Sequence, residues 1–312
     1  QRGLGKIKDA LQLVQQNYPE QHDLDIHNVA PFLRDPAVKK LLRQGLTMAC
    51  FYVESPAMRA LLRKLRADNF RALVAASSII RPGVSGSGMM AEYIRRYREP
   101  ERRKYIHPRM QEILQETYGV MVYQEDVLKV AHYFAGLSLE EADVLRRGMS
   151  WKFRERNQFQ SIKAKFFSNC QAQGYDSAIT QEVWRQIESF GNYAFAKGHS
   201  ASYAVESYQS LYLKAHYPLE YMTATINNGG GFYSLETYLN EARLHGARVE
   251  PPCVNDSGWQ SVLLHPRLIL GFQHLRDLEE HTVARLLEAR QQDGPFQSLS
   301  DFLQRVSISL EQ

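Results

Sequence analysis

The chain has 312 residues, of which 44% are hydrophobic and 23% charged, with 19 glycines and 12 prolines. This balance is that of a folded protein of about two domains, and it excludes a disordered chain, collagen and a coiled coil. Three cysteines far apart, Cys50, Cys170 and Cys253, argue against a disulfide framework or a Cys-x-x-Cys zinc site. No apolar run reaches the roughly 18 residues of a membrane helix, and the start QRGLGKIKDA has no apolar signal core. We therefore expect a cytoplasmic fragment of a longer protein, with no membrane partner.

Charge is distributed unevenly along a chain whose net charge is only +4. Residues 146–165 contain seven basic side chains and one acidic side chain, a surplus of +6, whereas residues 276–312 are mildly acidic. Uncompensated like charges repel one another unless anions such as phosphates neutralise them. The basic stretch therefore favours a phosphate-containing ligand, although on the charge count alone a solvated basic face is the better interpretation.

Helical periodicity dominates the predicted elements, and few segments look extended. In chain order, the sequence predicts an extended segment at 47–55, a helix over 56–66, a helix from Gln124 and a helix that begins at the capping box of Ser138 and Glu141. It then predicts a helix over 182–190, a longer helix that follows residues 191–200 and stops at Pro218, an extended segment at 267–272, and helices over 279–290 and from about 298. The run Asn-Asn-Gly-Gly-Gly-Phe at 227–232 interrupts the helical pattern. We therefore expect a mainly α protein with a domain boundary near residue 226.

The segment GNYAFAKGHS (191–200) is the sharpest local feature. Its glycines, Lys197 and His199 lead into the predicted helix, whose first amides and positive dipole end would face whatever Lys197 faces. These residues outline an anion site. On the residues alone, the preferred alternative is that Ser200 caps the helix, Lys197 is solvated and His199 bonds to a turn.

Two adjacent arginines, Arg146 and Arg147, lie near the end of the helix that begins at Ser138. Adjacent helical side chains point about a quarter-turn apart, so both reach one phosphate only if the ligand lies between their directions or the helix ends there. The glycine-rich loop at 81–88 carries Arg81 and suits a close approach of backbone to a phosphate or a template strand. A flexible connector explains that loop equally well.

No spacing in the sequence indicates a catalytic centre or a metal site. The ten histidines form no His-Glu-x-x-His pattern, and no Ser/His/Asp or Cys/His set has a local signature. Asp23 and Asp25 have the spacing of a carboxylate pair for Mg²⁺, but they lie in a polar loop. We therefore predict no catalytic and no metal-ligating residue in this chain.

Four segments together resemble the fingers region of bacterial C-family DNA polymerases, the alpha subunit of polymerase III and its paralogues. They are FYVESPAM (51–58), ASSIIRPGVSGSGMM (76–90), the stretch ETYGV…RRGMS (116–150) and FAKGHS…LEYM (195–222). The resemblance implies a remnant of the palm or connector at 1–30, a helical fingers domain at 31–226, and a linker with a helix-hairpin-helix-like module at 227–312. It also implies a DNA-directed DNA polymerase, a nucleotidyltransferase of DNA replication or translesion synthesis, as the parent protein.

The resemblance implies roles for individual residues. Those expected to bind the incoming dNTP are Arg146, Arg147, Lys197, His199, Ser200 and Tyr203, and those expected to bind template-primer DNA are Arg81, Gly83, Lys152, Arg154 and Arg156. In this family the palm supplies the metal-binding aspartates, so we expect Mg²⁺ and its ligands to lie upstream of Gln1 and the fragment alone to be inactive. A sliding clamp would be a partner through regions outside the fragment.

Departures from the family pattern refine these expectations. Ala196-Lys197-Gly198-His199 stands where the replicative subunit usually has Asn-Lys-Ser-His, which favours an error-prone or second-copy paralogue. The hairpin at 274–278 lacks the glycines that let backbone amides approach DNA, so the sequence leaves open whether this module contacts DNA. The alternative function is a non-enzymatic, helical nucleic-acid-binding module.

Overall fold

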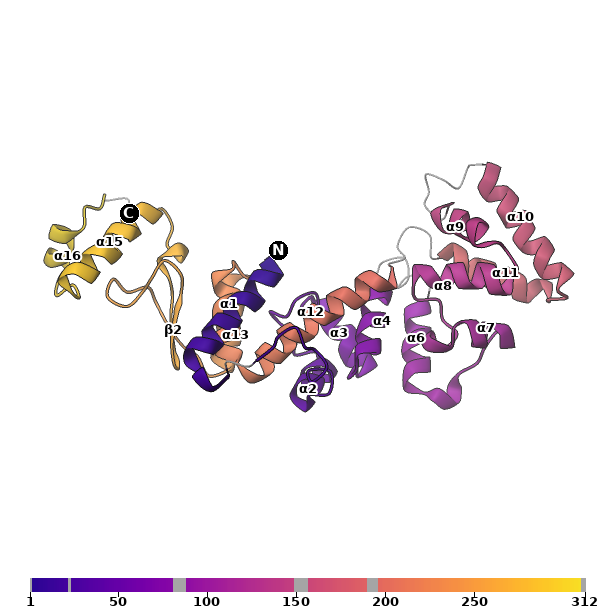
Figure 1. The fold of residues 1–312 in the computed structure, drawn as a ribbon, viewed down its shortest axis with the longest axis horizontal. Helices are drawn as coiled ribbons and strands as arrows, with labels where there is room; N and C mark the ends of the chain where they lie inside the picture. The colour runs from indigo at the N-terminus through magenta and orange to yellow at the C-terminus, as the bar shows by residue number, and fades with distance from the viewer. Residues whose placement is uncertain (1, 22–23, 81–87, 149–156, 190–195, 310–312) are drawn as a thin grey trace. The chain divides into compact units, whose positions relative to one another are not determined.

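A computed structural model of the chain describes residues 2–21, 24–80, 88–148, 157–189 and 196–309, and most of them lie in helices (Figure 1). The mainly α fold is thereby confirmed. The chain divides into two compact units. Unit 1 consists of Gln1–Val38, Thr47–Glu54 and Glu206–Gln312, and unit 2 consists of Lys39–Leu46 and Ser55–Val205. The division at residues 30 and 226 rests on composition and resemblance, and it stays a prediction.

Unit 2 is built mainly from helices. Its helices are α3 (Pro56–Leu65), α4 (Phe70–Ile79), α6 (Met89–Arg98), α7 (Pro108–Ile113), α8 (Gln124–Lys129), α9 (Leu139–Gly148), α10 (Asn157–Ala172) and α11 (Ser177–Ser189), with 3₁₀ turns at Pro100–Arg102 and Gln115–Thr117 and a π-helical turn at Val130–Phe134. Two helices, α2 (Pro36–Gln44) and α12 (Lys197–His216), have residues in both units. Within unit 2, α3 packs against α4, and α9 packs against α8 and α10.

Local signals placed several of these helices correctly. Ser55 accepts a hydrogen bond from the Met58 amide at the start of α3, as an N-cap does. The capping box before α9 is present, because the Ser138 amide donates to Glu141 Oε2 at 2.9 Å and the Glu141 amide donates to Ser138 Oγ at 3.2 Å. Predicted helix starts were less accurate, since α11 begins at Ser177 rather than at 182, and α12 begins at Lys197 rather than after Ser200.

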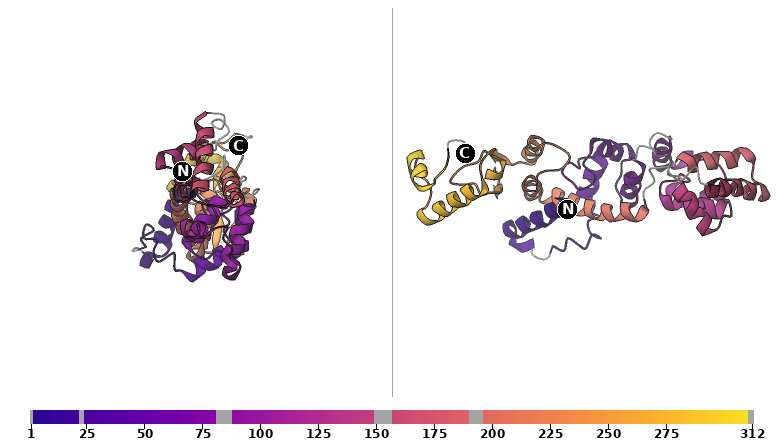
Figure 2. Two further views of the ribbon diagram at one scale, coloured as in Figure 1. Left: turned by 90° about the vertical axis from the view of Figure 1, so that its right-hand side faces the viewer. Right: turned by 90° about the horizontal axis from the view of Figure 1, so that it is seen from above.

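Unit 1 combines helices with a small sheet. It contains α1 (Arg2–Asn17), a 3₁₀ turn (Pro19–Gln21), α13 (Pro218–Asn227), α14 (Leu235–Leu244), strands β1 (Arg248–Glu250), β2 (Val262–Leu264) and β3 (Arg267–Ile269), a 3₁₀ turn (Phe272–His274), α15 (Glu280–Asp293) and α16 (Leu299–Arg305). Strand β3 lies between a parallel β1 and an antiparallel β2. Helix α1 packs on α13, and α15 lies beside α16 over an apolar cluster that includes Phe272, Leu286 and Phe296 (Figures 1 and 2). The predicted extended segment at 267–272 is confirmed as a strand over Arg267–Ile269, and both predicted C-terminal helices are confirmed.

The predicted extended segment at 47–55 is wrong. The chain forms consecutive turns there, with Ala49 and Tyr52 in the left-handed region at φ 68° and 65°. Carbonyl groups of this segment accept hydrogen bonds from side chains of α12 and α13 rather than from a neighbouring strand. The buried Lys214 ammonium donates to the Met48 carbonyl at 2.8 Å, and the Tyr221 hydroxyl donates to the Ala49 carbonyl at 2.8 Å.

The carboxylate of Glu54 connects this turn segment to the glycine run of unit 1. It accepts hydrogen bonds from the Ala49 amide at 3.0 Å, the Phe232 amide at 3.0 Å and the Tyr238 hydroxyl at 2.7 Å. Gly231 passes so close that an added Cβ would lie 2.2 Å from Glu54 Oε1 and 2.8 Å from the Tyr238 hydroxyl. The glycine is therefore required by close approach.

We expect Gly231→Ala to lower the free energy of unfolding by about 1–3 kcal/mol, because the methyl group must displace a hydrogen-bonded carboxylate. Urea denaturation monitored by circular dichroism measures this change. The matched control is Gly258→Ala in the same unit, where the nearest atom to an added Cβ is 3.4 Å away. Equal stability of the two variants would contradict the close-approach argument.

Candidate functional site

Lys197 is the first residue of α12, and acidic residues distant in the sequence bind both its amide and its side chain. Its ammonium lies 2.7 Å from each carboxylate oxygen of Glu116, and 5.6 Å from the centre of the Tyr123 ring. Its main-chain amide donates to the two oxygens of Glu125 at 3.0 and 3.1 Å. The predicted anion-binding end of α12 thus binds an anion of the chain itself, a carboxylate.

Arg146 and Arg147, at the end of α9, converge on a single carboxylate. Arg146 Nε lies 2.9 Å from Asp143 Oδ1, and Arg147 Nε lies 3.0 Å from Asp143 Oδ2. Asp143 precedes them by one helical turn, the spacing at which helical side chains meet. The two guanidinium groups can therefore bind one anionic group between their directions, which is the condition that the sequence left open.

The first turn of α8 is the common neighbour of Arg146 and Lys197. Arg146 Nη1 lies 3.5 Å from Gln124 Oε1, while the next residue, Glu125, binds the Lys197 amide. Residues of α9 and α12 that are about fifty positions apart in the sequence thus contact adjacent residues of α8. Four residues of this site were not predicted from the sequence, namely Glu116, Gln124, Glu125 and Asp143. Of these, Asp143 has a local signal, its helical spacing from the arginines.

The other residues predicted to bind nucleotide differ in exposure. His199 is exposed, and its ring lies 6.5 Å from that of the half-buried Tyr203 in a stacked orientation. Ser200 is fully buried, and its hydroxyl lies 2.8 Å from that of Ser78 in α4, so it packs α12 within unit 2 and does not cap the helix. A role for these three residues in nucleotide binding stays a prediction. The residues predicted to bind DNA, Arg81, Gly83, Lys152, Arg154 and Arg156, lie outside the described residues.

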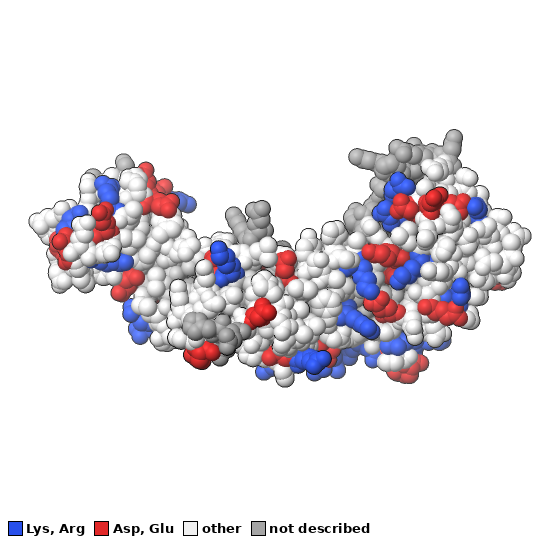
Figure 3. Space-filling view, in the orientation of Figure 1, with Lys and Arg blue, Asp and Glu red and all other residues white. Residues whose placement is uncertain are grey.

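Every basic side chain of residues 146–165 that the structure describes is ion-paired, so the positive charge of this stretch is partly compensated rather than uncompensated. Lys163 pairs with Glu188 at 3.2 Å, Lys165 pairs with Glu141, and Asp143 binds the two arginines. These acids lie outside the counted stretch, so a count along the sequence does not register them. Acidic and basic side chains accordingly lie side by side on the face of unit 2 drawn in Figure 3.

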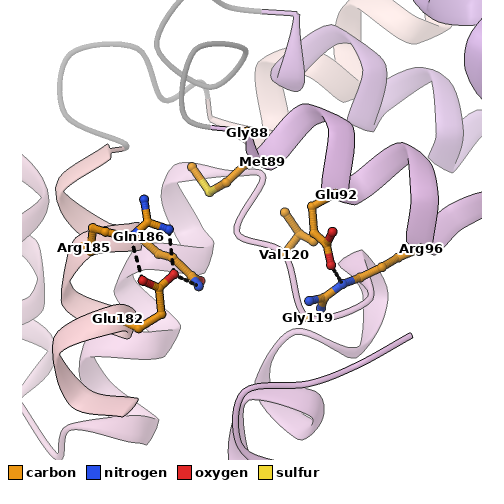
Figure 4. A pocket seen from close by; sticks show the side chains of 9 residues that line it. All are labelled: Gly88, Met89, Glu92, Arg96, Gly119, Val120, Glu182, Arg185 and Gln186. Atoms are coloured by element: carbon orange, nitrogen blue, oxygen red, sulfur yellow. Dashed lines mark hydrogen bonds and ion pairs between the residues drawn. The ribbon is translucent and has the colours of Figure 1, made fainter. Parts of the chain in front are cut away.

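A separate hollow of about 310 Å³ in unit 2 is lined by charged residues of α6 and α11. Glu92 pairs with Arg96 on one side, and Glu182 pairs with Arg185 on the other (Figure 4). The two carboxylates neutralise the two guanidinium groups, so the side chains of this hollow have no net charge that would attract a phosphate. We assign it no ligand.

The start of α8 is held by a buried carboxylate. Asp126, which is 3% exposed, accepts hydrogen bonds from the amides of Val122 at 2.9 Å and Tyr123 at 3.0 Å. Burial raises the pKa of Asp126 to about 6, although these hydrogen bonds act in the opposite direction. The turn that places Gln124 and Glu125 therefore depends on a carboxylate that titrates in weakly acidic solution.

The described part of the chain contains no cluster of three His, Cys, Asp or Glu residues that could hold a metal ion. The same residues include no helix with the length and apolar composition needed to cross a bilayer.

Comparison with known proteins shows the family. Residues 3–174 match the model of the bacterial DNA polymerase III alpha subunit finger domain, and residues 246–312 match a helix-hairpin-helix motif. The DNA polymerase III subunit alpha of Aquifex aeolicus is 34% identical over 303 residues, 96% of this chain and 26% of that protein. That of Mycobacterium tuberculosis is 36% identical over 315 residues, 99% of this chain and 26% of the relative. An error-prone DNA polymerase of Vibrio parahaemolyticus is 36% identical over 298 residues, 93% of this chain and 29% of that protein.

The fingers match covers more than half of the chain, and the chain therefore belongs to the family of the bacterial DNA polymerase III alpha subunit finger domain. It spans about a quarter of the length of the relatives it matches. Relatives with either name, alpha subunit or error-prone polymerase, are equally similar, so the predicted subclass stays a prediction.

We expect the carboxyl group of Asp126 to titrate with a pKa near 6 in a ¹³C NMR titration, because burial penalises its charged form. The folded pKa lies above the unfolded value of 3.8, so the group's contribution to stability is complete below about pH 4 and falls by about 3 kcal/mol as the pH rises through 6. The control is Asp68, whose pKa is lowered because hydrogen bonds from Arg43 and Asn69 outweigh its burial. A pKa of Asp126 below 4 would contradict the assignment.

Proposed function

We propose that the chain is the nucleotide-binding fingers part of a DNA-directed DNA polymerase. Arg146, Arg147 and Lys197 bind the triphosphate of the incoming dNTP, and the basic residues outside the described ranges contact template-primer DNA. The observation that carries this proposal is the convergence of both arginines on Asp143, because the geometry that binds one carboxylate between two guanidinium groups also suits a phosphate.

The chemistry proposed for these residues is positioning and charge stabilisation. Phosphoryl transfer needs the triphosphate held in line and its developing charge neutralised, which fixed guanidinium and ammonium groups provide. Mg²⁺ would activate the primer hydroxyl, but the described residues hold no ligand set that fits it. We propose that the metal-binding carboxylates lie elsewhere in the parent polymerase, which works in the cytoplasm and contacts a sliding clamp through other regions.

The helix-hairpin-helix region has no proposed contact with DNA. His274 is half-buried, with Nε2 3.2 Å from Ser261 Oγ, and Asp277 adopts a left-handed φ of 63°, a backbone conformation that glycine adopts more readily. A side chain at Asp277 keeps a phosphate from approaching as it would approach a glycine backbone, and the negative charge opposes it.

The alternative function is a non-enzymatic nucleic-acid-binding module, which would use the same helices and the same basic side chains. The family membership favours the polymerase, because the fingers match over residues 3–174 covers α8, α9 and Glu116. Binding of dNTP discriminates the two functions, since a nucleic-acid-binding module requires no site for free nucleotides.

We expect the triple variant Arg146→Ala/Arg147→Ala/Lys197→Ala to bind dATP at least about tenfold more weakly, because three charge-assisted contacts are lost. Its binding to primer-template DNA should also weaken, and the salt dependence of that binding should decrease by up to about 2–3 in slope. Calorimetry and fluorescence anisotropy measure the two affinities.

The matched control removes three other exposed, ion-paired cations of unit 2. These are Arg43, which pairs with Asp68, Arg109, which pairs with Glu112, and Arg185, which pairs with Glu182. The control triple alanine variant loses the same charge and should keep its dATP affinity within about twofold, because only long-range electrostatics change. Equal losses in the two triple variants would refute the phosphate-binding assignment.

We also expect no primer extension by the 312-residue chain supplied with Mg²⁺, dNTPs and primer-template DNA. The described residues provide no carboxylate cluster to hold the metal ions that the chemistry needs. A gel-based extension assay tests this, with the full-length alpha subunit of Aquifex aeolicus as the positive control. Measurable extension would show that the catalytic carboxylates lie within this chain.

A further inference from the structure

We propose that Glu116 is an internal competitor of the nucleotide phosphates, whose carboxylate occupies the Lys197 ammonium until a nucleotide displaces it. This inference rests on the proposed function of Lys197. Both oxygens of Glu116 lie 2.7 Å from the Lys197 ammonium, so the carboxylate takes the position that two phosphate oxygens of a bound nucleotide would take.

The Lys197–Glu116 ion pair is exposed enough for another anion to replace the Glu116 carboxylate. The side chains of Lys197 and Glu116 are 39% and 38% exposed, and ion pairs of such exposure contribute little to stability because water screens them. By contrast, the Lys214–Glu241 pair of unit 1 has a fully buried ammonium, which has no access to a ligand. Glu116 is therefore a partner that a multiply charged anion can replace.

The surroundings of Lys197 hold the residue in place when Glu116 leaves. Glu125 binds its amide, and the buried Tyr123 ring lies 5.6 Å from its ammonium, within the range of a cation–π contact. Glu116 belongs to the short 3₁₀ turn Gln115–Thr117, and within the described ranges its carboxylate accepts hydrogen bonds from the Lys197 ammonium. The competitor can therefore move without disturbing the element that carries the cation.

The two acidic groups around Lys197 thus have different roles. Glu125 contacts the backbone, is half-buried and fixes the start of α12, so we call it a positioning residue. Glu116 contacts Lys197 at the charged end of its side chain. Its negative charge lowers the affinity of the site for every anion, and nucleotides with more phosphates are better able to displace it.

The test is a double-mutant cycle of Glu116→Gln and Lys197→Ala in the 312-residue chain, with dATP binding measured by calorimetry at low salt. We expect Glu116→Gln to bind dATP about two- to fivefold more tightly, which is the range that an exposed ion pair provides. In the Lys197→Ala background the same substitution should have no effect, because the cation for which Glu116 competes is absent.

The control is Glu112→Gln, which changes the net charge equally but frees Arg109 instead of Lys197. It should change the affinity for dATP by less than about 1.5-fold. If Lys197→Ala weakens binding but Glu116→Gln gains no more than Glu112→Gln, the competitor role is wrong and the proposed function stands. If Lys197→Ala leaves dATP affinity unchanged, the proposed function itself fails.

Discussion

The hydrogen bonds from the Lys197 amide to the Glu125 carboxylate join the start of α12 to the first turn of α8, and the candidate site depends on them. The neighbouring Gln124 contacts Arg146, so one turn of helix sets the positions of both cations. Asp126 stabilises this first turn of α8, because its buried carboxylate accepts hydrogen bonds from the amides of Val122 and Tyr123. Since the Glu125 bonds involve the backbone of residue 197, they fix where α12 begins whatever side chain stands there.

Local structure was predictable from the sequence where its cause is local. The caps of α3 and α9 join residues three apart, and a pattern of that length is visible in the sequence. The segment at 47–55 was predicted wrongly because its turns depend on Lys214 and Tyr221, which lie more than 150 residues away. The aromatic and branched residues of this segment favour a strand locally, but the hydrogen bonds from Lys214 and Tyr221 stabilise turns instead.

The cations of the candidate site were predictable, but most of their partners were not. Asp143 is separated from the arginines by one helical turn, a spacing that a sequence reveals. Glu116 and Glu125 lie 81 and 72 residues before Lys197, and no periodicity connects them with it. For the same reason the surplus of +6 at 146–165 was read as uncompensated, although Glu141 and Glu188 neutralise part of it in the fold.

Ion pairing lowers the affinity with which the basic side chains of the candidate site bind a phosphate. A phosphate that binds Lys197 or the two arginines must replace a carboxylate, so the affinity reflects the difference between two ion pairs rather than the full attraction of a free cation. A triphosphate has the advantage in that exchange, because it carries more charge and more acceptor oxygens than a single carboxylate. Acidic partners also keep the guanidinium and ammonium groups oriented before any ligand arrives, which reduces the conformational entropy lost on binding. Discrimination among anions then comes from charge density and geometry, not from the net charge of the chain.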